Sequence, residues 1–299
     1  MAMAVPAEHR SQSTEWPTVA LAVVIYGGWL ALTAWHAALP WPVLLAGGAW
    51  LIAWQGSLQH EVIHGHPTHH RWINLAIGFV PLALWLPYAT YAREHAAHHT
   101  TGELTDPFDD PESNYLPRAG GVLHALAWID ATLLGRMVVG PPIRVVRFWL
   151  AEVRRATTDP AGVAREWLPH LGGVALVLVW LSHVGLSPLA YVLCFVWPGT
   201  SLALIRSYAE HRASPDPAAR TAIVADFGPL ALLFLNNNLH AWHHARQALP
   251  WYALPALYRA APDAFPQAPR YPGYGALIVR HLLRPHDQLV HPSRTTPGA

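Results

Sequence analysis

The chain has 299 residues, of which 53% are hydrophobic and 12% are charged, whereas soluble domains carry about 25% charged residues. This composition favours a protein embedded in lipid. The formal net charge of +1 gives no basis for nucleic-acid binding, and the single cysteine, Cys194, excludes a disulfide framework and a cysteine-ligated cluster.

Two long segments, residues 16–60 and 167–205, contain no Asp, Glu, Lys or Arg. A membrane-spanning helix needs about 20 apolar residues, and each segment is about twice that length. Proline and glycine interrupt both segments in the middle, at residues 40–42 and 185–188. The sequence therefore predicts two helical hairpins, which contain the transmembrane helices 18–39, 42–59, 168–184 and 188–208.

Residues 60–165, between the hairpins, are expected to lie at the membrane interface and in a cap. Residues 72–92 are free of formal charge, but two prolines interrupt them. A span here would move the following histidines to the opposite side of the membrane, so we expect an interfacial or re-entrant element. Residues 101–113 predict a turn-rich loop, and residues 122–165 mix apolar residues with arginines, as helices on a membrane surface do.

Residues 209–299 hold the last histidine cluster and a tail rich in Pro, Tyr and Arg, which is expected to complete the cap. No second domain is evident. The sequence predicts one all-α integral membrane domain over residues 1–299, with four transmembrane helices in two hairpins (18–59 and 168–208) under a helical cap.

The distribution of basic residues predicts the orientation in the membrane. The chain has no lysine, and no arginine lies in either predicted hairpin turn. The positive-inside rule places the arginines at the other ends of the helices in the cytoplasm. These are Arg10, Arg136, Arg144, Arg147, Arg154, Arg155, Arg165, Arg206 and Arg212. We therefore expect a multi-pass protein of a bacterial inner membrane, with both termini and the cap cytoplasmic.

Three groups of histidines stand at helical spacing. His60 and His64 are four residues apart, and residues 95–99 and 240–244 each form an HxxHH pattern. Positions i, i+3 and i+4 share one face of a helix, so each group can direct its imidazoles at one point. Eight imidazoles are too many for one ion, because zinc takes four ligands and octahedral metals take six. Two metal ions are implied, and imidazole alone suits iron, copper, zinc or nickel.

The segments 60–66 (HEVIHGH), 93–99 (REHAAHH) and 236–244 (NNNLHAWHH) resemble the three histidine boxes of the membrane fatty-acid desaturase superfamily. This superfamily includes carotenoid ketolases and hydroxylases and, more distantly, alkane hydroxylases. The resemblance runs from the first hairpin to about residue 252. It implies a mushroom-shaped bundle of four membrane helices under a cytosolic cap that holds two irons. The implied ligands are the box histidines and one just past the last membrane helix, namely His60, His64, His95, His98, His99, His211, His240, His243 and His244.

Two further side chains are candidate ligands. His66 lies at the end of the first box, although the neighbouring Gly65 and Pro67 indicate a turn. Asn236 resembles an asparagine that can reach a metal through water, and helix capping is an equal alternative.

Carboxylates that accept from ligand N–H groups commonly orient the imidazoles. The candidates for this role are Glu61, Asp106 and Asp226. Of the four acidic residues in the turn-rich loop (Asp106, Asp109, Asp110 and Glu112), only one is expected to touch the site, because Asp-Pro pairs favour turns. Six other histidines are expected at the surface: His9, His124, His170, His281, His286 and His291.

The resemblance implies an O2-dependent oxidase with two Fe2+ ions, which acts on C–H bonds of a long-chain acyl or other lipid taken from the bilayer. Fatty acyl desaturation is the first expectation, and carotenoid or alkyl hydroxylation or ketone formation is the alternative. No heme-binding His-Pro-Gly-Gly segment is present, so a separate ferredoxin, rubredoxin or cytochrome is expected to supply electrons.

Two other classes compete with the oxidase. Residues 60–64 also form an HExxH motif, in which zinc proteases use two histidines and a glutamate, but such an enzyme leaves the two HxxHH groups unexplained. A metal transporter would place its ligands near the middle of the membrane, whereas these groups follow the ends of apolar segments.

Overall fold

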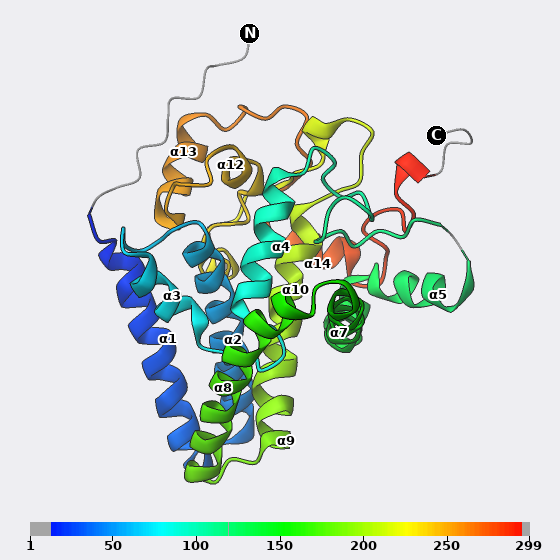
Figure 1. Cartoon of the computed structure of the whole chain (residues 1–299). Helices are drawn as coiled ribbons and strands as arrows, with labels where there is room; N and C mark the ends of the chain where they lie inside the picture. Colours follow the sequence, from blue (N-terminus) through cyan, green and yellow to red (C-terminus); the bar gives the residue numbers. More distant parts are fainter. Residues whose placement is uncertain (1–12, 119, 295–299) are drawn as a thin grey trace.

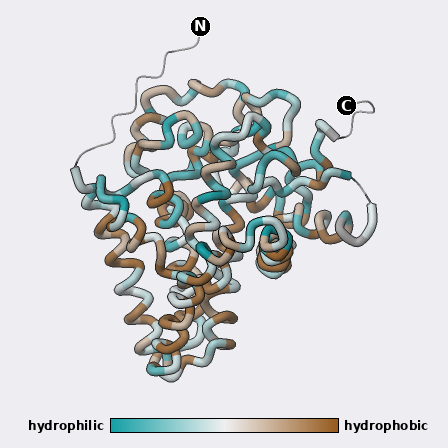
Figure 2. Tube along the Cα trace, in the orientation of Figure 1, coloured by the Kyte–Doolittle hydropathy of each residue, from teal (hydrophilic) through white to brown (hydrophobic). Residues whose placement is uncertain are grey.

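A computed structural model describes residues 13–118 and 120–294 (Figure 1). Arg10 and His9, to which the sequence assigned a cytoplasmic and a surface position, lie outside these residues. The molecule is narrow at one end, where two helical hairpins turn, and broad at the other, where short helices and loops gather. The narrow end is mainly hydrophobic, and hydrophilic residues concentrate in the broad end (Figure 2).

The described residues are mostly helical, as predicted. The helices are α1 (Trp16–Ala34), η1 (His36–Ala38), α2 (Trp41–Ile63), α3 (Arg71–Phe79), α4 (Tyr88–Thr100), α5 (Gly121–Asp130), α6 (Leu133–Val138), α7 (Gly140–Thr158), α8 (Pro160–Val184), α9 (Pro188–Tyr191), η2 (Val192–Val196), α10 (Trp197–Glu210), η3 (Pro217–Ala219), α11 (Pro229–Leu233), α12 (His240–Ala245), η4 (Trp251–Ala253), α13 (Leu254–Ala260), α14 (Tyr274–His281) and η5 (Pro292–Arg294).

Two short strands depart from the all-α prediction. β1 (Ile223–Val224) and β2 (Arg270–Tyr271) pair in parallel, with Ile223 opposite Arg270 and Val224 opposite Tyr271. Prolines flank the second segment and keep it extended, so its carbonyl groups remain available to the backbone N–H groups of the first.

The long helices are interrupted at the predicted breaks. Pro42 lies in the first turn of α2, where its missing N–H is not needed. Gly185 ends α8 in the left-handed conformation (φ 77°), and the Ser187 side chain accepts from the N–H of Ala190 at the start of α9. α8 begins eight residues before the predicted span, at Pro160, because Asp159 caps it by accepting from Gly162 N at 2.9 Å.

Three helices are long and apolar enough to cross a membrane: Trp16–Ala34, Pro160–Val184 and Pro188–Glu210. The last of these comprises α9, η2 and α10. α2 is 23 residues long and packs against both α1 and α10, but its C-terminal part carries buried polar residues, including Gln55, Gln59 and Glu61. These residues make α2 less apolar than its neighbours.

Residues 80–87, between α3 and α4, form a non-helical segment inside the bundle. Leu82 is fully buried there. Buried carbonyl groups need donors, and side chains of the surrounding helices supply them. The bonds run from Gln59 to Gly78 (2.8 Å), Gln55 to Val80 (2.9 Å), Tyr191 to Leu82 (2.8 Å) and His170 to Leu84 (3.0 Å). α3 has only nine residues, so the predicted re-entrant element fits better than a span.

Three histidines that the sequence assigned to the surface are buried: His170, His281 and His291. His170 donates to the segment just described, and His291 holds the C-terminal tail. The His291 Nε2 atom lies 3.0 Å from Thr105 Oγ1, and Leu116 bridges to Val290 through the backbone. Residues 290–293 therefore fasten the loop 101–118, which leads away from α4.

Glycines allow α2 to approach the second hairpin closely. A Cβ atom at Gly199 of α10 would lie 2.5 Å from Ile52 Cβ of α2, and one at Gly48 of α2 would lie 2.7 Å from the Phe195 ring. Small residues at such contacts let helix backbones pack tightly in membranes.

Gly199→Ala is expected to lower the free energy of unfolding by about 1–3 kcal/mol, because the added methyl group would overlap Ile52. Gly27→Ala is the matched control, since nothing lies within 4 Å of a Cβ at that position of α1. Thermal unfolding of both variants in detergent checks this. Equal midpoints for the two variants would contradict the close packing.

Candidate metal centre

Four elements bring nine histidines together at the broad end of the helical bundle. α2 supplies His60, and His64 follows directly at its C-terminal cap. α4 carries residues 95–99, α12 carries residues 240–244, and His211 is the first residue after α10. The i, i+3, i+4 spacing within α4 and α12 turns each set of imidazoles to one side of its helix, as predicted.

The nine side chains form two groups, and within each group the candidate ligand atoms all lie within 4.8 Å of one another. The first group is His60, His64, His95, His99 and His243, and the second is His98, His211, His240 and His244. The groups are adjacent, because the ring centroids of His99 and His244 are 4.4 Å apart. Each HxxHH pattern contributes to both groups.

The distances between ring nitrogens fit metal coordination. Nitrogens at right angles around a metal, each about 2.1 Å from it, would lie about 3.0 Å apart. The observed Nε2–Nε2 distances are 3.1 Å (His64–His95), 3.0 Å (His95–His99), 3.2 Å (His99–His243), 3.3 Å (His98–His244), 2.9 Å (His211–His240) and 3.0 Å (His240–His244). The Nε2 atom of His60 is buried without a hydrogen-bond partner among the described residues. This donor set fits transition metals.

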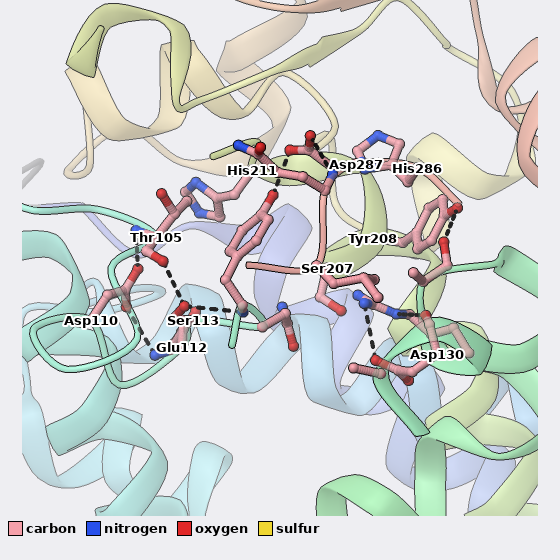
Figure 3. A pocket seen from close by; sticks show the side chains of 17 residues that line it. Thr105, Asp110, Glu112, Ser113, Asp130, Ser207, Tyr208, His211, His286 and Asp287 are labelled. Atoms are coloured by element: carbon pink, nitrogen blue, oxygen red, sulfur yellow. Dashed lines mark hydrogen bonds and ion pairs between the residues drawn. The ribbon is translucent and has the colours of Figure 1, made fainter. Parts of the chain in front are cut away.

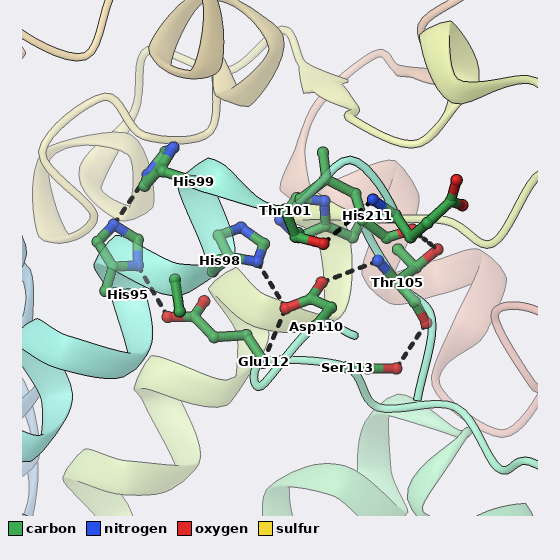
Figure 4. Close-up of polar contacts among 12 residues, drawn as sticks. His95, His98, His99, Thr101, Thr105, Asp110, Glu112, Ser113 and His211 are labelled. Atoms are coloured by element: carbon green, nitrogen blue, oxygen red, sulfur yellow. Dashed lines mark hydrogen bonds and ion pairs between the residues drawn. The ribbon is translucent and has the colours of Figure 1, made fainter. Parts of the chain in front are cut away.

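Carboxylates hold the opposite nitrogens of two α4 histidines (Figure 4). His95 Nδ1 lies 2.8 Å from Glu112 Oε1, and His98 Nδ1 lies 2.8 Å from Asp110 Oδ1. A carboxylate that accepts from Nδ1–H places the lone pair on Nε2, which faces the group. These two residues therefore fix both the tautomer and the direction of the imidazoles.

The second group has its own acceptors. His240 Nδ1 lies 3.1 Å from Asn237 Oδ1, and the Asn237 amide donates to Glu210 at 2.7 Å. Arg206 pairs with the same Glu210 carboxylate at 3.1 Å. His211 Nδ1 lies 3.1 Å from the carbonyl oxygen of Arg220. Each acceptor again leaves Nε2 directed at the group.

Electrostatics keep most of these imidazoles neutral. Burial and neighbouring imidazoles lower the pKa of His99 to about 3 and that of His211 to about 4. The same causes lower the pKa well below the usual value for four others, namely His64, His240, His243 and His244. A neutral imidazole has the free lone pair that a metal requires. His98 differs, because Asp110 raises its pKa although burial opposes this.

Of the two additional candidate ligands, His66 lies outside both groups. His66 Nδ1 is 2.6 Å from the buried carboxylate of Glu15, just before α1. The Asn236 amide donates to the carbonyl oxygen of Trp251 at 3.1 Å, and Asn236 itself adopts a left-handed conformation (φ 56°). It does not cap α12, whose N-cap residue is Leu239.

The three carboxylates proposed to orient ligands have other partners. Glu61 accepts from the backbone N–H of Trp251 at 3.1 Å. Asp106 accepts from Phe108 N at 2.9 Å and from Ser293 Oγ at 3.0 Å. Asp226 accepts from Gly228 N and Tyr274 N at 2.7 and 2.9 Å. These bonds stabilise turns and hold the cap segments together.

The sequence predicted too few contacts between the loop 101–113 and the histidines. It also gave no role to Asn237 and Glu210. Two of the loop's acidic residues, Asp110 and Glu112, contact grouped histidines, whereas one contact was expected. Asn237 lies three residues before His240, and Glu210 directly precedes His211. Proximity to a box was therefore a usable signal for this second pair.

A cavity of about 400 Å³ lies beside the centre. It is lined by α2, the segment 80–87, α4, α7, α10 and the loop at residues 111–114. Glu112, which holds His95, belongs to its wall, so the cavity reaches the layer directly around the histidines. Much of the remaining lining is apolar, including Ile52, Leu86 and Phe234. A mainly apolar cavity next to a polar centre suits a lipid-like ligand.

A smaller polar chamber of about 50 Å³ lies on the side of His211 (Figure 3). Asp110 and Glu112 line it, together with the paired side chains of Tyr115 and Asp287 (2.9 Å). Its volume is enough for a few water molecules.

A bundle of apolar helices topped by two largely buried histidine groups suggests a membrane protein with a metal site. A model of the fatty acid desaturase family matches residues 33–275, a range that includes all nine histidines. The chain therefore belongs to the fatty acid desaturase family, which confirms the resemblance of its histidine boxes. A comparison with curated proteins gives no match.

Asp110→Asn and Glu112→Gln are each expected to weaken metal binding by about 10–100-fold, because the neutral side chains hold the Nδ1–H of His98 and His95 less firmly. Metal content after dialysis against a graded series of chelator concentrations measures this. Asp109→Asn is the control, since Asp109 is exposed in the same loop. If all three variants retain metal equally, these carboxylates do not support the centre.

Proposed function

We propose that the chain is an O2-dependent di-iron oxidase of the membrane, which acts on C–H bonds of a lipid substrate and most directly serves as a fatty acyl desaturase. One observation carries this proposal: nine mostly neutral imidazoles form two adjacent groups, with five and four nitrogen donors. Two ions account for nine donors, whereas one ion does not. The proposed ligands are the nine grouped histidines.

Iron is the proposed metal because the chain belongs to the desaturase family and imidazole suits iron. A bound iron pair would supply the power to activate O2 and remove hydrogen from an unactivated C–H bond. The protein itself orients the ligands through Asp110, Glu112 and Asn237. It also excludes bulk water by burying His60, His98, His240 and His243.

The mainly apolar cavity supports a lipid substrate that enters from the bilayer. Fatty acyl desaturation agrees best with the family. Hydroxylation or ketone formation on a carotenoid or alkyl substrate is the alternative outcome of the same hydrogen removal. A ferredoxin, rubredoxin or cytochrome supplies the electrons.

The position of Glu61 favours the oxidase over a zinc protease. In an HExxH protease this glutamate acts on a water molecule at the metal. Here its carboxylate accepts from the backbone of Trp251, and His60 and His64 share their group with three further histidines.

Four spans complete the proposal: α1, α2, α8 and the helix from Pro188 to Glu210. α2 has 23 residues, about 34 Å at 1.5 Å per residue, and its polar side chains are buried within the bundle. The two helical hairpins cross a bacterial inner membrane, with the histidine centre and both termini in the cytoplasm.

Replacing His64, His98 or His243 by alanine is expected to abolish activity, because each change removes a donor from one of the groups. Membrane insertion should persist. Iron content measured by plasma mass spectrometry should fall from about two ions per chain in the parent protein. His183→Ala, at an exposed position near the far end of α8, is the control. A purified triple variant with full activity would refute the ligand assignment.

The topology predicts where reporters are exported. Alkaline phosphatase fused after residue 40 or 186 should be active, since both positions lie in hairpin turns. Fusions after residue 66 or 246 should be inactive, because both positions lie near the histidine centre. The reverse pattern would invert the orientation, and uniform activity would contradict the hairpins.

Expression in a host whose lipids are then profiled by mass spectrometry identifies the reaction. Loss of two hydrogens from an acyl chain is the expected product. Gain of one oxygen would indicate hydroxylation, and gain of one oxygen with loss of two hydrogens would indicate ketone formation. The His98→Ala variant is the control, and an unchanged lipid and carotenoid profile with the parent protein would contradict the oxidase.

A further inference from the structure

The C-terminal tail after α14 runs beside the loop that supports the histidine centre. Its backbone bonds to the loop at Leu116, whose N–H donates to the carbonyl oxygen of Leu289 at 2.8 Å. The N–H of His291 donates to the carbonyl oxygen of Leu116 at 3.1 Å. The His291 side chain then enters the protein, where its exposed fraction is 0%. A buried imidazole needs polar partners, so the contacts of His291 show what the tail holds.

Both ring nitrogens of His291 have polar partners. Nε2 lies 3.0 Å from Thr105 Oγ1, and Nδ1 lies 2.7 Å from Ser293 Oγ. Ser293 in turn donates to Asp106 Oδ2 at 3.0 Å. The tail therefore holds two consecutive residues of the loop, Thr105 and Asp106.

Thr105 has an unusual backbone conformation. Its φ angle is 71°, in the left-handed region that β-branched residues rarely adopt. Such a conformation persists only where surrounding contacts hold it. Ser113 Oγ donates to the Thr105 carbonyl oxygen at 2.6 Å, and the Thr105 N–H donates to Asp110 Oδ2 at 2.8 Å (Figure 4). The His291 contact, at the side chain, adds a restraint from outside the loop.

Thr105 is connected to the second group of histidines through Asp110. While Asp110 Oδ2 accepts from Thr105, its Oδ1 atom lies 2.8 Å from His98 Nδ1. A carboxylate that is held at one oxygen keeps the other directed at the imidazole. His98 belongs to the second group, with His211, His240 and His244. A continuous series of contacts thus leads from the tail to one of the two groups.

We propose that His291 and Ser293 are positioning residues of the second group. They keep Thr105 in its left-handed conformation, so that its N–H stays on Asp110 and Asp110 directs His98. This inference rests on the proposed function in one respect, namely that the grouped histidines bind metal. Loosening the tail should therefore weaken metal binding by the second group more than by the first.

Binding of Co2+ tests the proposal, because imidazole binds this ion and its visible absorption reports coordination. The full-length protein is freed of metal in detergent, and Co2+ is titrated in competition with a chelator. His98→Ala removes a donor from the second group and so identifies the signal of that group. His291→Phe removes the polar contacts and keeps a ring, and Ser293→Ala is a milder change that retains the imidazole. Asp109→Asn, exposed in the same loop, is the matched control.

His291→Phe should lower the Co2+ affinity of the second group by about three- to tenfold, and Ser293→Ala by less, with the first group unchanged. Asp109→Asn should match the parent protein. Thr105→Gly, added to His291→Phe, should restore most of the affinity, because glycine adopts a positive φ without strain. A tail that only stabilised the fold could not be replaced by this change in the loop.

Unchanged affinity in both tail variants, or a loss that Thr105→Gly does not restore, would overturn the positioning role. If His291→Phe does not fold, Ser293→Ala with and without Thr105→Gly decides the question. A parent protein that binds no Co2+ would refute the metal centre of the proposed function and the positioning role with it. Two bound ions with equal affinities in all tail variants would refute the positioning role alone.

Discussion

The structure depends on hydrogen bonds that orient the imidazole rings. Acceptors at Nδ1 direct the Nε2 lone pairs toward the histidine centre. An unpaired buried nitrogen is costly, and the protein supplies acceptors for the Nδ1 side of several of these rings. Asp110 and Glu112 do this for α4, and Asn237 with Glu210 does it for α12. The short, irregular cap segments follow from this demand, because straight helices alone could not supply acceptors from so many directions.

The hydrophobic helical bundle also helps to position the histidine centre. α2 packs against α1, η2 and α10, and it changes along its length from small apolar residues near Gly48 to a polar end at His60. Gln55, in between, donates to the Val80 carbonyl group of the segment 80–87, and Gln59 donates to the Gly78 carbonyl group at the end of α3. That segment closes the inner part of the cavity and leads directly into α4. The walls of the cavity and the positions of the α4 histidines are thereby set by one continuous stretch of chain.

The sequence was sufficient for features that depend on local periodicity. Gaps in charge located the long apolar helices, and the HxxHH spacing located the histidines that converge. The sequence was insufficient where partners are distant: Glu112 is 17 residues from His95, and no helical spacing relates them. His291 was assigned to the surface because its hydrogen-bond partner, Thr105, is 186 residues away. No residue near His291 in the sequence indicates this contact. Long-range polar contacts in irregular loops leave no periodic pattern, and these contacts make up much of the layer around the centre.

The fastening of the loop 101–118 by residues 290–293 bears on how the protein is made. The loop carries the acceptors for His95 and His98, yet His291, which contacts Thr105 of this loop, is translated 186 residues after Thr105. The helices can enter the membrane before residues 290–293 have been translated and contact the loop. The loop can be fastened only after residues 290–293 have been translated, so a chain that stalls before them would have an unfastened loop and a poorly supported histidine centre.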